Sequence, residues 1–124
     1  MKILLSIKPE FAEKILTGKK RFEFRKVLFR NPNVQTVVIY ATMPVGKVVG
    51  EFEVGGILSA GPKKLWLQTS EFAGIAHPYF KEYFDGREIG HAIKVGKVRR
   101  YKRPLDLTEV LPSGVAPQSF CYLL

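Results

Sequence analysis

The segment Gly18–Arg25 holds three side chains that could do chemistry together, Lys20, Glu23 and Arg25. On an ideal strand Glu23 and Arg25 lie on the same face, whereas Lys20 belongs to the turn after Gly18, where strict alternation need not hold. A lysine that is partly desolvated beside a carboxylate can have a perturbed pKa and can serve as a base, a nucleophile or a phosphate ligand. The alternative is a solvated lysine beside an exposed Glu–Arg pair worth less than about 1 kcal/mol.

A second cluster, Arg99-Arg100-Tyr101-Lys102-Arg103, combines four cations with one aromatic ring. Such cations can neutralise phosphates while Tyr101 stacks on a base. A solvated strand end with charged residues would give the same pattern. Gln118, further along the chain, could read the edge of a base or cap a turn.

The net charge of +9 is concentrated in two parts of the chain. Residues 1–30 carry nine Lys or Arg against three acidic residues, residues 31–90 carry five against six, and residues 91–124 carry six against two. If the fold brings the two basic parts together, one positive face results, which is the pattern expected for a polyanionic partner. The surplus lysines could instead serve only solubility.

Length and composition predict a single domain over residues 1–124, with 46% hydrophobic and 25% charged residues. No apolar run approaches the ~20 residues of a membrane span, and the start Met1–Pro9 has too short an apolar run for a signal peptide. One cysteine, Cys121, fits a reducing compartment, so we expect a cytoplasmic location. The histidines and Cys121 show no metal-ligand spacing and no cofactor motif is present, which predicts neither a metal nor a cofactor.

The first half of the chain shows the periods of one helix and several strands. A short apolar run at 3–7 is typical of a buried strand, and helical spacing follows over 9–17, with Pro9 at the first helical position. Alternation from Lys20 onwards predicts a half-buried strand with Phe22 and Phe24 on its apolar face. Further strands are expected over 34–42 and 47–58, and Gly55-Gly56 allows a bulge in the second of them.

Two helical segments are expected between residues 61 and 84. The first begins at Gly61-Pro62, and the second is predicted over 71–84, with a disturbance at His77-Pro78. We interpret the aromatic residues of this second helix as core packing. Strands are then predicted over 88–101 and 120–124. This order favours an α+β fold, a small mixed β-barrel with helices at its ends, over a doubly wound sheet.

The pattern Gly18-x-Lys20-x-x-Glu23-x-Arg25 after a β-α start resembles the signature of the ASCH domain, a branch of the PUA-like superfamily of small β-barrels. The resemblance extends over nearly the whole chain. Within the family, the sequence is most similar to the ASCH subfamily described as predicted transcriptional regulators. The further segments that carry it are Leu4–Pro9, Phe22–Arg25, Tyr40–Pro44, Gly50–Val54 and Pro117–Phe120.

The resemblance implies a barrel with a cleft beside the first helix that binds RNA or a modified nucleoside. Together with the charge distribution, it leads to the hypothesis of an RNA- or nucleotide-binding module. Lys8, Lys20 and Arg25 would contact phosphate or a base. Glu23 would orient these cations or accept a hydrogen bond from a base amino group. The basic segment 99–103, including Arg99, Arg100 and the aromatic Tyr101, would follow the RNA backbone.

An enzyme acting in the same cleft is the alternative, with Lys20 and Glu23 as its acid/base pair. Some ASCH proteins are amidohydrolases of acetylated cytidine that use a lysine, a threonine three residues later and a distant glutamate. Lys20 matches that lysine, but Glu23 occupies the threonine position and cannot supply a hydroxyl nucleophile. The candidates for the distant glutamate are Glu51, Glu53 and Glu71. Other ASCH proteins cleave RNA, so ribonuclease activity stays open, as does a protein-interaction module with an acidic partner.

Overall fold

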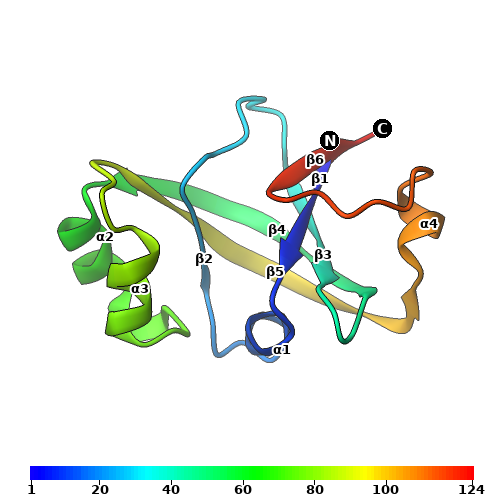
Figure 1. Cartoon of the computed structure of the whole chain (residues 1–124), viewed down its shortest axis with the longest axis horizontal. Coiled ribbons are helices and arrows are strands. Elements are labelled where there is room, and N and C mark those ends of the chain that lie inside the picture. The colour runs from blue at the N-terminus through cyan, green and yellow to red at the C-terminus, as the bar shows by residue number, and fades with distance from the viewer.

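A curled six-stranded sheet with the strand order β2-β5-β4-β3-β1-β6 organises the computed structural model, which describes residues 1–124 (Figure 1). The strands are β1 (Lys2–Ile7), β2 (Phe22–Arg25), β3 (Thr36–Ala41), β4 (Lys47–Ala60), β5 (Gly90–Leu105) and β6 (Phe120–Leu123). The helical segments are α1 (Pro9–Leu16), α2 (Pro62–Thr69), η1 (Ser70–Phe72), α3 (His77–Tyr83) and α4 (Leu107–Val110). Strand β1 pairs parallel with β3, and the other pairs are antiparallel. The predicted α+β class and small mixed β-barrel are confirmed, and the sheet curls into a half-barrel.

The two longest strands, β4 and β5, give the sheet its curl. Their pairing shifts register at three places, including one between Val54 and Gly56, so the expected bulge is present. Such bulges add local twist and let a long strand bend around a core. Gly50 lies where α1 crosses these strands, because a Cβ atom there would stand 2.7 Å from the Arg99 carbonyl oxygen and 2.8 Å from Leu16 Cδ2. The missing side chain therefore lets α1 pack directly on the sheet.

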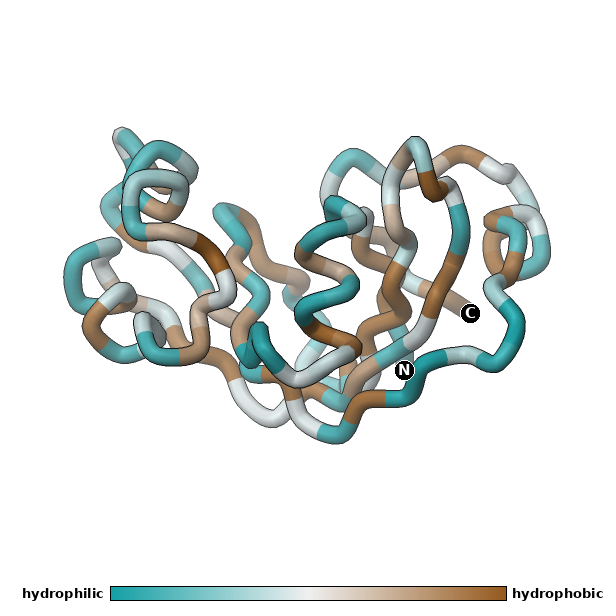
Figure 2. The backbone as a smooth tube through the Cα atoms, turned by 90° about the horizontal axis from the view of Figure 1, so that it is seen from below, coloured by the Kyte–Doolittle hydropathy of each residue, from teal (hydrophilic) through white to brown (hydrophobic).

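Three groups of apolar side chains hold these elements together. The largest fills the concave side of the sheet beneath α1, where Ile15 and Ala12 are buried. Figure 2 shows α1 crossing the middle of the molecule with hydrophobic and hydrophilic residues in alternation. A second group joins α2 and α3 to β2 through Phe24, Phe80 and Phe84, and a third lies beneath α4. Burying each such side chain contributes roughly 1.5–3 kcal/mol.

The structure differs from the sequence predictions in three segments. The helix predicted over 71–84 is broken, because residues 73–76 are not helical and α3 begins only at His77, with Pro78 in its first turn. The short helix α4 was not predicted, although its capping box pairs Asp106 with Glu109. Strand β2 is buried on both faces rather than one, since the Glu23 side chain turns into a pocket instead of bulk solvent. None of the helices has the length and apolar character needed to cross a bilayer.

Candidate functional site

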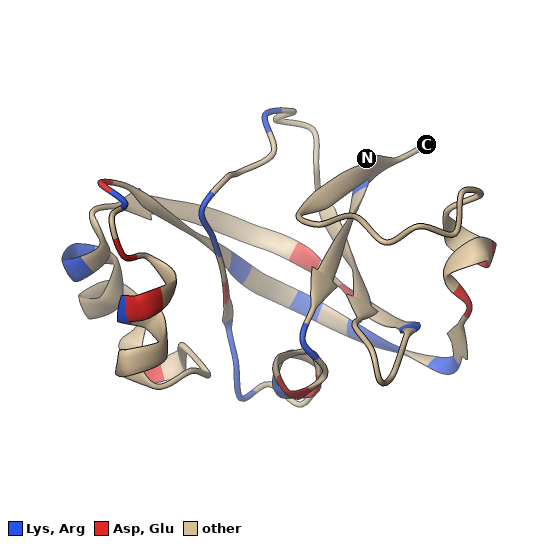
Figure 3. Cartoon of the chain, viewed as in Figure 1, with Lys and Arg blue, Asp and Glu red and all other residues tan.

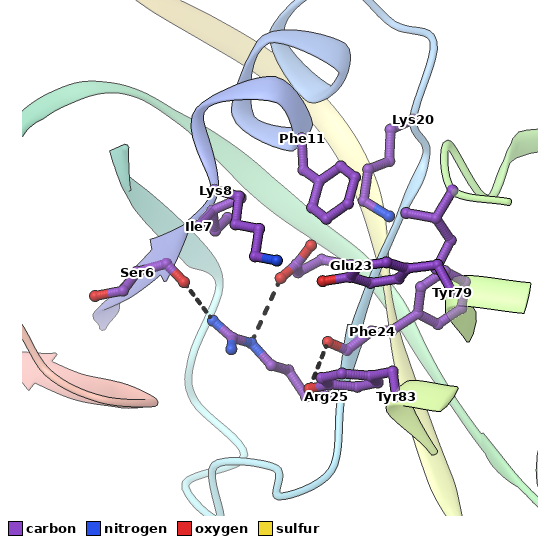
Figure 4. Close-up of a pocket in the computed structure, with 11 residues that line it drawn as sticks. Ser6, Ile7, Lys8, Phe11, Lys20, Glu23, Phe24, Arg25, Tyr79 and Tyr83 are labelled. Atoms are coloured by element: carbon purple, nitrogen blue, oxygen red, sulfur yellow. Dashed lines mark hydrogen bonds and ion pairs between the residues drawn. The ribbon is translucent and has the colours of Figure 1, made fainter. Parts of the chain in front are cut away.

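A pocket of about 160 Å³ lies between the start of α1, strand β2 and helix α3 (Figure 4). Its only acidic residue is Glu23, which faces three cations and four aromatic rings across a space that could hold one heterocyclic ring system. The residues that line it are Ser6, Ile7, Lys8, Phe11, Lys20, Glu23, Phe24, Arg25, Ile75, Tyr79 and Tyr83. Four of the predicted site residues, Lys8, Lys20, Glu23 and Arg25, are therefore brought together.

Lys20 is the most buried charged residue of this pocket, with 2% of its surface exposed. Its Nζ atom donates a hydrogen bond of 2.7 Å to the carbonyl oxygen of Ala73 and lies 4.7 Å from the centre of the Phe24 ring. Burial lowers the pKa of Lys20 to about 8, because removal from water disfavours the ammonium form, while nearby Glu23 raises it. Near neutral pH this amine can therefore both hold and release a proton.

The non-helical segment 73–76 fixes the position of Lys20. Gly74 has a φ of +68°, a conformation that glycine adopts without strain, and its carbonyl oxygen accepts a 3.1 Å hydrogen bond from Lys14 Nζ. A Cβ atom at Gly74 would overlap the Lys20 side chain. The sequence predicted a disturbance at His77-Pro78 but not the non-helical segment before it, whose own signal was Gly74.

Arg25 and Glu23 form a partly buried ion pair beside Lys20. The Arg25 Nε atom lies 3.5 Å from Glu23 Oε2, and Arg25 Nη2 donates a 3.1 Å hydrogen bond to the Ser6 carbonyl oxygen. The Nε atom is buried without a hydrogen-bond partner of good geometry. Glu23 forms its ion pair with Arg25, through Oε2, and not with Lys20 (Figure 4). Its other carboxylate oxygen therefore remains available to a ligand.

Two tyrosines of α3 complete the wall of the pocket. The Nζ atom of Lys8 lies 5.1 Å from the centre of the Tyr79 ring, and the Tyr79 hydroxyl raises the pKa of Lys8. The Tyr83 hydroxyl donates a 3.3 Å hydrogen bond to the Phe24 carbonyl oxygen, and burial raises the pKa of Tyr83. Phe80 and Phe84 pack in the core as predicted, whereas Tyr79 and Tyr83 face the pocket. Their spacing of four residues on one helix was the signal that could have found them.

The other predicted binding residues lie outside this pocket. On β5, Arg99 pairs with Glu51 at 2.9 Å, Arg100 pairs with Glu13 of α1 at 2.8 Å, and the Tyr101 hydroxyl donates to Glu51 at 2.8 Å. Figure 3 shows Lys and Arg residues spread along β5, with acidic residues on neighbouring elements. No residue of 91–124 lines the pocket, so the two basic parts of the chain do not converge on it. Long-range ion pairs partly neutralise the second part.

Gln118 and the three candidate distant glutamates also lie outside the pocket. Gln118 is exposed, although the neighbouring Pro117 carbonyl oxygen accepts a 2.7 Å hydrogen bond from the Ser6 hydroxyl at the pocket edge. Glu51 is engaged by Arg99 and Tyr101, and Glu53 and Glu71 are exposed. The pocket thus has one carboxylate, and none of these residues adds a second.

The lowered pKa of Lys20 predicts a specific pH dependence of stability. Between the folded value of about 8 and the ordinary value of 10.5, the unfolded chain binds a proton that the folded protein does not. The free energy of unfolding contributed by this group therefore rises as the pH rises through that window. The free energy of unfolding of wild type, measured in urea relative to that of Lys20→Met, should therefore increase by about 2 kcal/mol between pH 7 and pH 10. A difference that stays constant with pH would contradict an altered pKa.

Comparison with known proteins assigns the family. A family model described as ASCH domain matches residues 5–99. The chain belongs to the ASCH domain family. Within it, an ASCH domain-containing ribonuclease from Zymomonas mobilis is 30% identical over 123 residues, which cover 97% of this chain and 82% of that protein. The crystal structure of ASCH from Zymomonas mobilis has a TM-score of 0.92 with 29% identity, covering 99% of this chain and 87% of that one.

This ASCH domain also matches parts of two much longer proteins from Ureaplasma parvum. It is 33% identical to a region of a protein named ATP synthase subunit alpha and 30% identical to a region of one named large ribosomal subunit protein uL22. The matched regions cover 98% of this chain in both cases but only 15% and 39% of those proteins.

Proposed function

We propose that this ASCH domain binds RNA and that the pocket beside α1 receives the base of one nucleotide. The observation that carries the proposal is the combination of four aromatic rings, three cations and a single carboxylate around a space of about 160 Å³. Proteins recognise unpaired RNA bases by stacking them on aromatic rings and by hydrogen bonds to their edges. The net charge of +9 supports a polyanionic ligand.

The residues of the pocket suit separate parts of a nucleotide. Phe11 and Tyr79, whose ring centres lie 5.3 Å apart in an edge-to-face arrangement, offer a surface on which a base would stack. Glu23 would accept a hydrogen bond from a base amino group, while Lys8 at the rim would contact a phosphate. Arg25 orients Glu23 through their ion pair.

We further propose that residues 1–124 act as one unit in the cytoplasm and that RNA binding serves a regulatory role. Pairing of β1 with β6 joins the two ends of the chain in one sheet, which supports a single unit. The single cysteine supports a reducing compartment. The regulatory role rests on the resemblance to the ASCH subfamily of predicted transcriptional regulators.

Loss of the rim cation Lys8 should weaken RNA binding more than loss of a lysine elsewhere. Lys8→Ala is expected to lower the affinity for a single-stranded 12-nucleotide RNA by roughly fivefold to tenfold in fluorescence anisotropy, because the phosphate contact of a lysine that Tyr79 holds at the rim disappears. Lys63→Ala on α2 removes the same charge from an exposed site away from the pocket and is the control. Equal losses in both variants, or no binding by wild type at 50 mM salt, would contradict the proposal.

Ribonuclease activity is a second candidate, supported by the relative named a ribonuclease and by the lowered pKa of Lys20. In this scheme Glu23 accepts the proton of a ribose 2′-hydroxyl, and the 2′-oxygen forms a bond to the adjacent phosphorus. The bond from phosphorus to the 5′-oxygen breaks, and the Lys20 ammonium gives its proton to that oxygen. The products are a 2′,3′-cyclic phosphate and a 5′-hydroxyl, which mass spectrometry of a labelled RNA would identify.

The amidohydrolase alternative has less support from the site. Its third residue would be a distant glutamate, and Glu51, Glu53 and Glu71 all lie outside the pocket. Incubation with acetylated cytidine tests it directly, since release of acetate would show that the single carboxylate suffices.

A further inference from the structure

A second hollow, called the groove below, also borders Lys20. It has a volume of about 520 Å³ and lies between the end of α1, the start of β2, η1 and the middle of β5. We propose that the groove binds the sugar–phosphate backbone of the RNA strand whose base occupies the pocket. The inference rests on the proposed function and adds to it a second binding surface. The residues that carry it are Lys20, Arg21, Phe72 and Lys94.

The charge of the groove is entirely positive. Arg21 and Lys94 line it and are exposed, and no aspartate or glutamate does so. Neither residue takes part in an ion pair, in contrast to Arg99, Arg100 and Arg103, each of which is paired with a glutamate. A phosphate can therefore bind these two cations without displacing a protein carboxylate. That makes the groove a stronger polyanion site than the basic segment 99–103.

The backbone around Arg21 holds the groove in shape. The Arg21 amide donates a 2.9 Å hydrogen bond to the Phe72 carbonyl oxygen, and the Val95 amide donates a 2.9 Å hydrogen bond to the Arg21 carbonyl oxygen. These bonds tie η1, β2 and β5 together at one residue. The Arg21 guanidinium lies 4.6 Å from the centre of the Phe72 ring, which restricts its orientation. The cation is thus placed before any ligand arrives.

An exposed aromatic ring favours RNA over an acidic protein as the occupant. Phe72 is 38% exposed beneath Arg21, so a base can stack on it while the guanidinium contacts phosphate. Stacking platforms beside cations are typical of grooves for single-stranded nucleic acid. Lys20 lines both the pocket and the groove, so the two hollows are neighbours on either side of one residue.

The test compares charge loss in the groove with equal charge loss elsewhere. Wild type, Arg21→Gln/Lys94→Gln and the control Lys63→Gln/Lys64→Gln are titrated with a single-stranded 12-nucleotide RNA over a range of salt concentrations. The groove variant is expected to bind on the order of tenfold more weakly and to lower the salt slope by about 1.4, since two single-strand phosphate contacts are lost. The control should differ from wild type by less than about twofold. Phe72→Leu should weaken binding several-fold at an unchanged salt slope, because it removes no charge.

The outcomes separate the groove from the pocket. Identical affinities and slopes for the groove and control variants would overturn the inference, as would equally strong competition by a poly-glutamate peptide. An effect of the groove variant without any effect of Lys8→Ala would support the groove and contradict the base pocket. An effect of Lys8→Ala without any effect of the groove variant would support the base pocket and contradict the groove. No binding of RNA by wild type would overturn both proposals.

Discussion

For the ribonuclease candidate, replacing Lys20 by methionine is expected to slow RNA cleavage by at least about a hundredfold, the usual contribution of a general acid or base. Methionine has a similar length and suits the apolar surroundings of Phe11 and Phe24, so the fold should persist. What is lost is the proton that the Lys20 ammonium would give to the leaving 5′-oxygen. Initial rates of cleavage of a labelled RNA at pH 7 measure the effect.

The matched control for this experiment is Lys19→Met, which makes the same substitution at the preceding, exposed position. It should cleave RNA within about twofold of wild type, because an exposed lysine contributes little to the pocket. Cleavage by wild type should also fall as the pH rises above about 8, where Lys20 loses its proton. Cleavage by Lys20→Met at the wild-type rate would exclude Lys20 as the acid. No cleavage by wild type would remove the ribonuclease candidate and leave the RNA-binding proposal.

Glu23→Gln should destabilise the folded protein by about 3 kcal/mol, because it leaves the Arg25 guanidinium without its partner. Glu23 is 7% exposed and the Arg25 Nε atom beside it is already buried without a hydrogen bond. The amide has nearly the same shape, so the change isolates the charge. Urea unfolding of wild type and variant at pH 7 provides the measurement.

Glu53→Gln serves as the control for Glu23→Gln, since Glu53 is exposed on β4 and takes part in no ion pair. Its effect should stay within about 0.5 kcal/mol. A second readout distinguishes electrostatics from packing. Glu23 raises the pKa of Lys20, so that pKa should fall further in Glu23→Gln, as NMR of the lysine side chain would show. An unchanged pKa and equal stability losses in the two variants would contradict the role assigned to Glu23.

Local patterns in the sequence predicted much of the fold. Alternating and helical periods located β2, β3, β6 and α1, and the ASCH signature singled out Lys20, Glu23 and Arg25 before any contact was known. The disturbance at His77-Pro78 was predicted, but the extent of the break over 73–76 was not, because it depends on Gly74 fitting against Lys20 in the folded protein. The ion pairs of the basic segment 99–103 also escaped prediction, because Glu13 and Glu51 lie 87 and 48 residues away from the arginines that they pair with.

The sequence by itself determined which chemical groups this ASCH domain possesses and which strands and helices carry them. Only the tertiary structure decided that Lys20 is buried against Ala73, that Tyr79 and Tyr83 close the pocket, and that Arg21 and Lys94 border an acid-free groove. The physical reason is that burial and pairing of charges depend on contacts between residues far apart in the chain, whereas periodicity reports only on near neighbours.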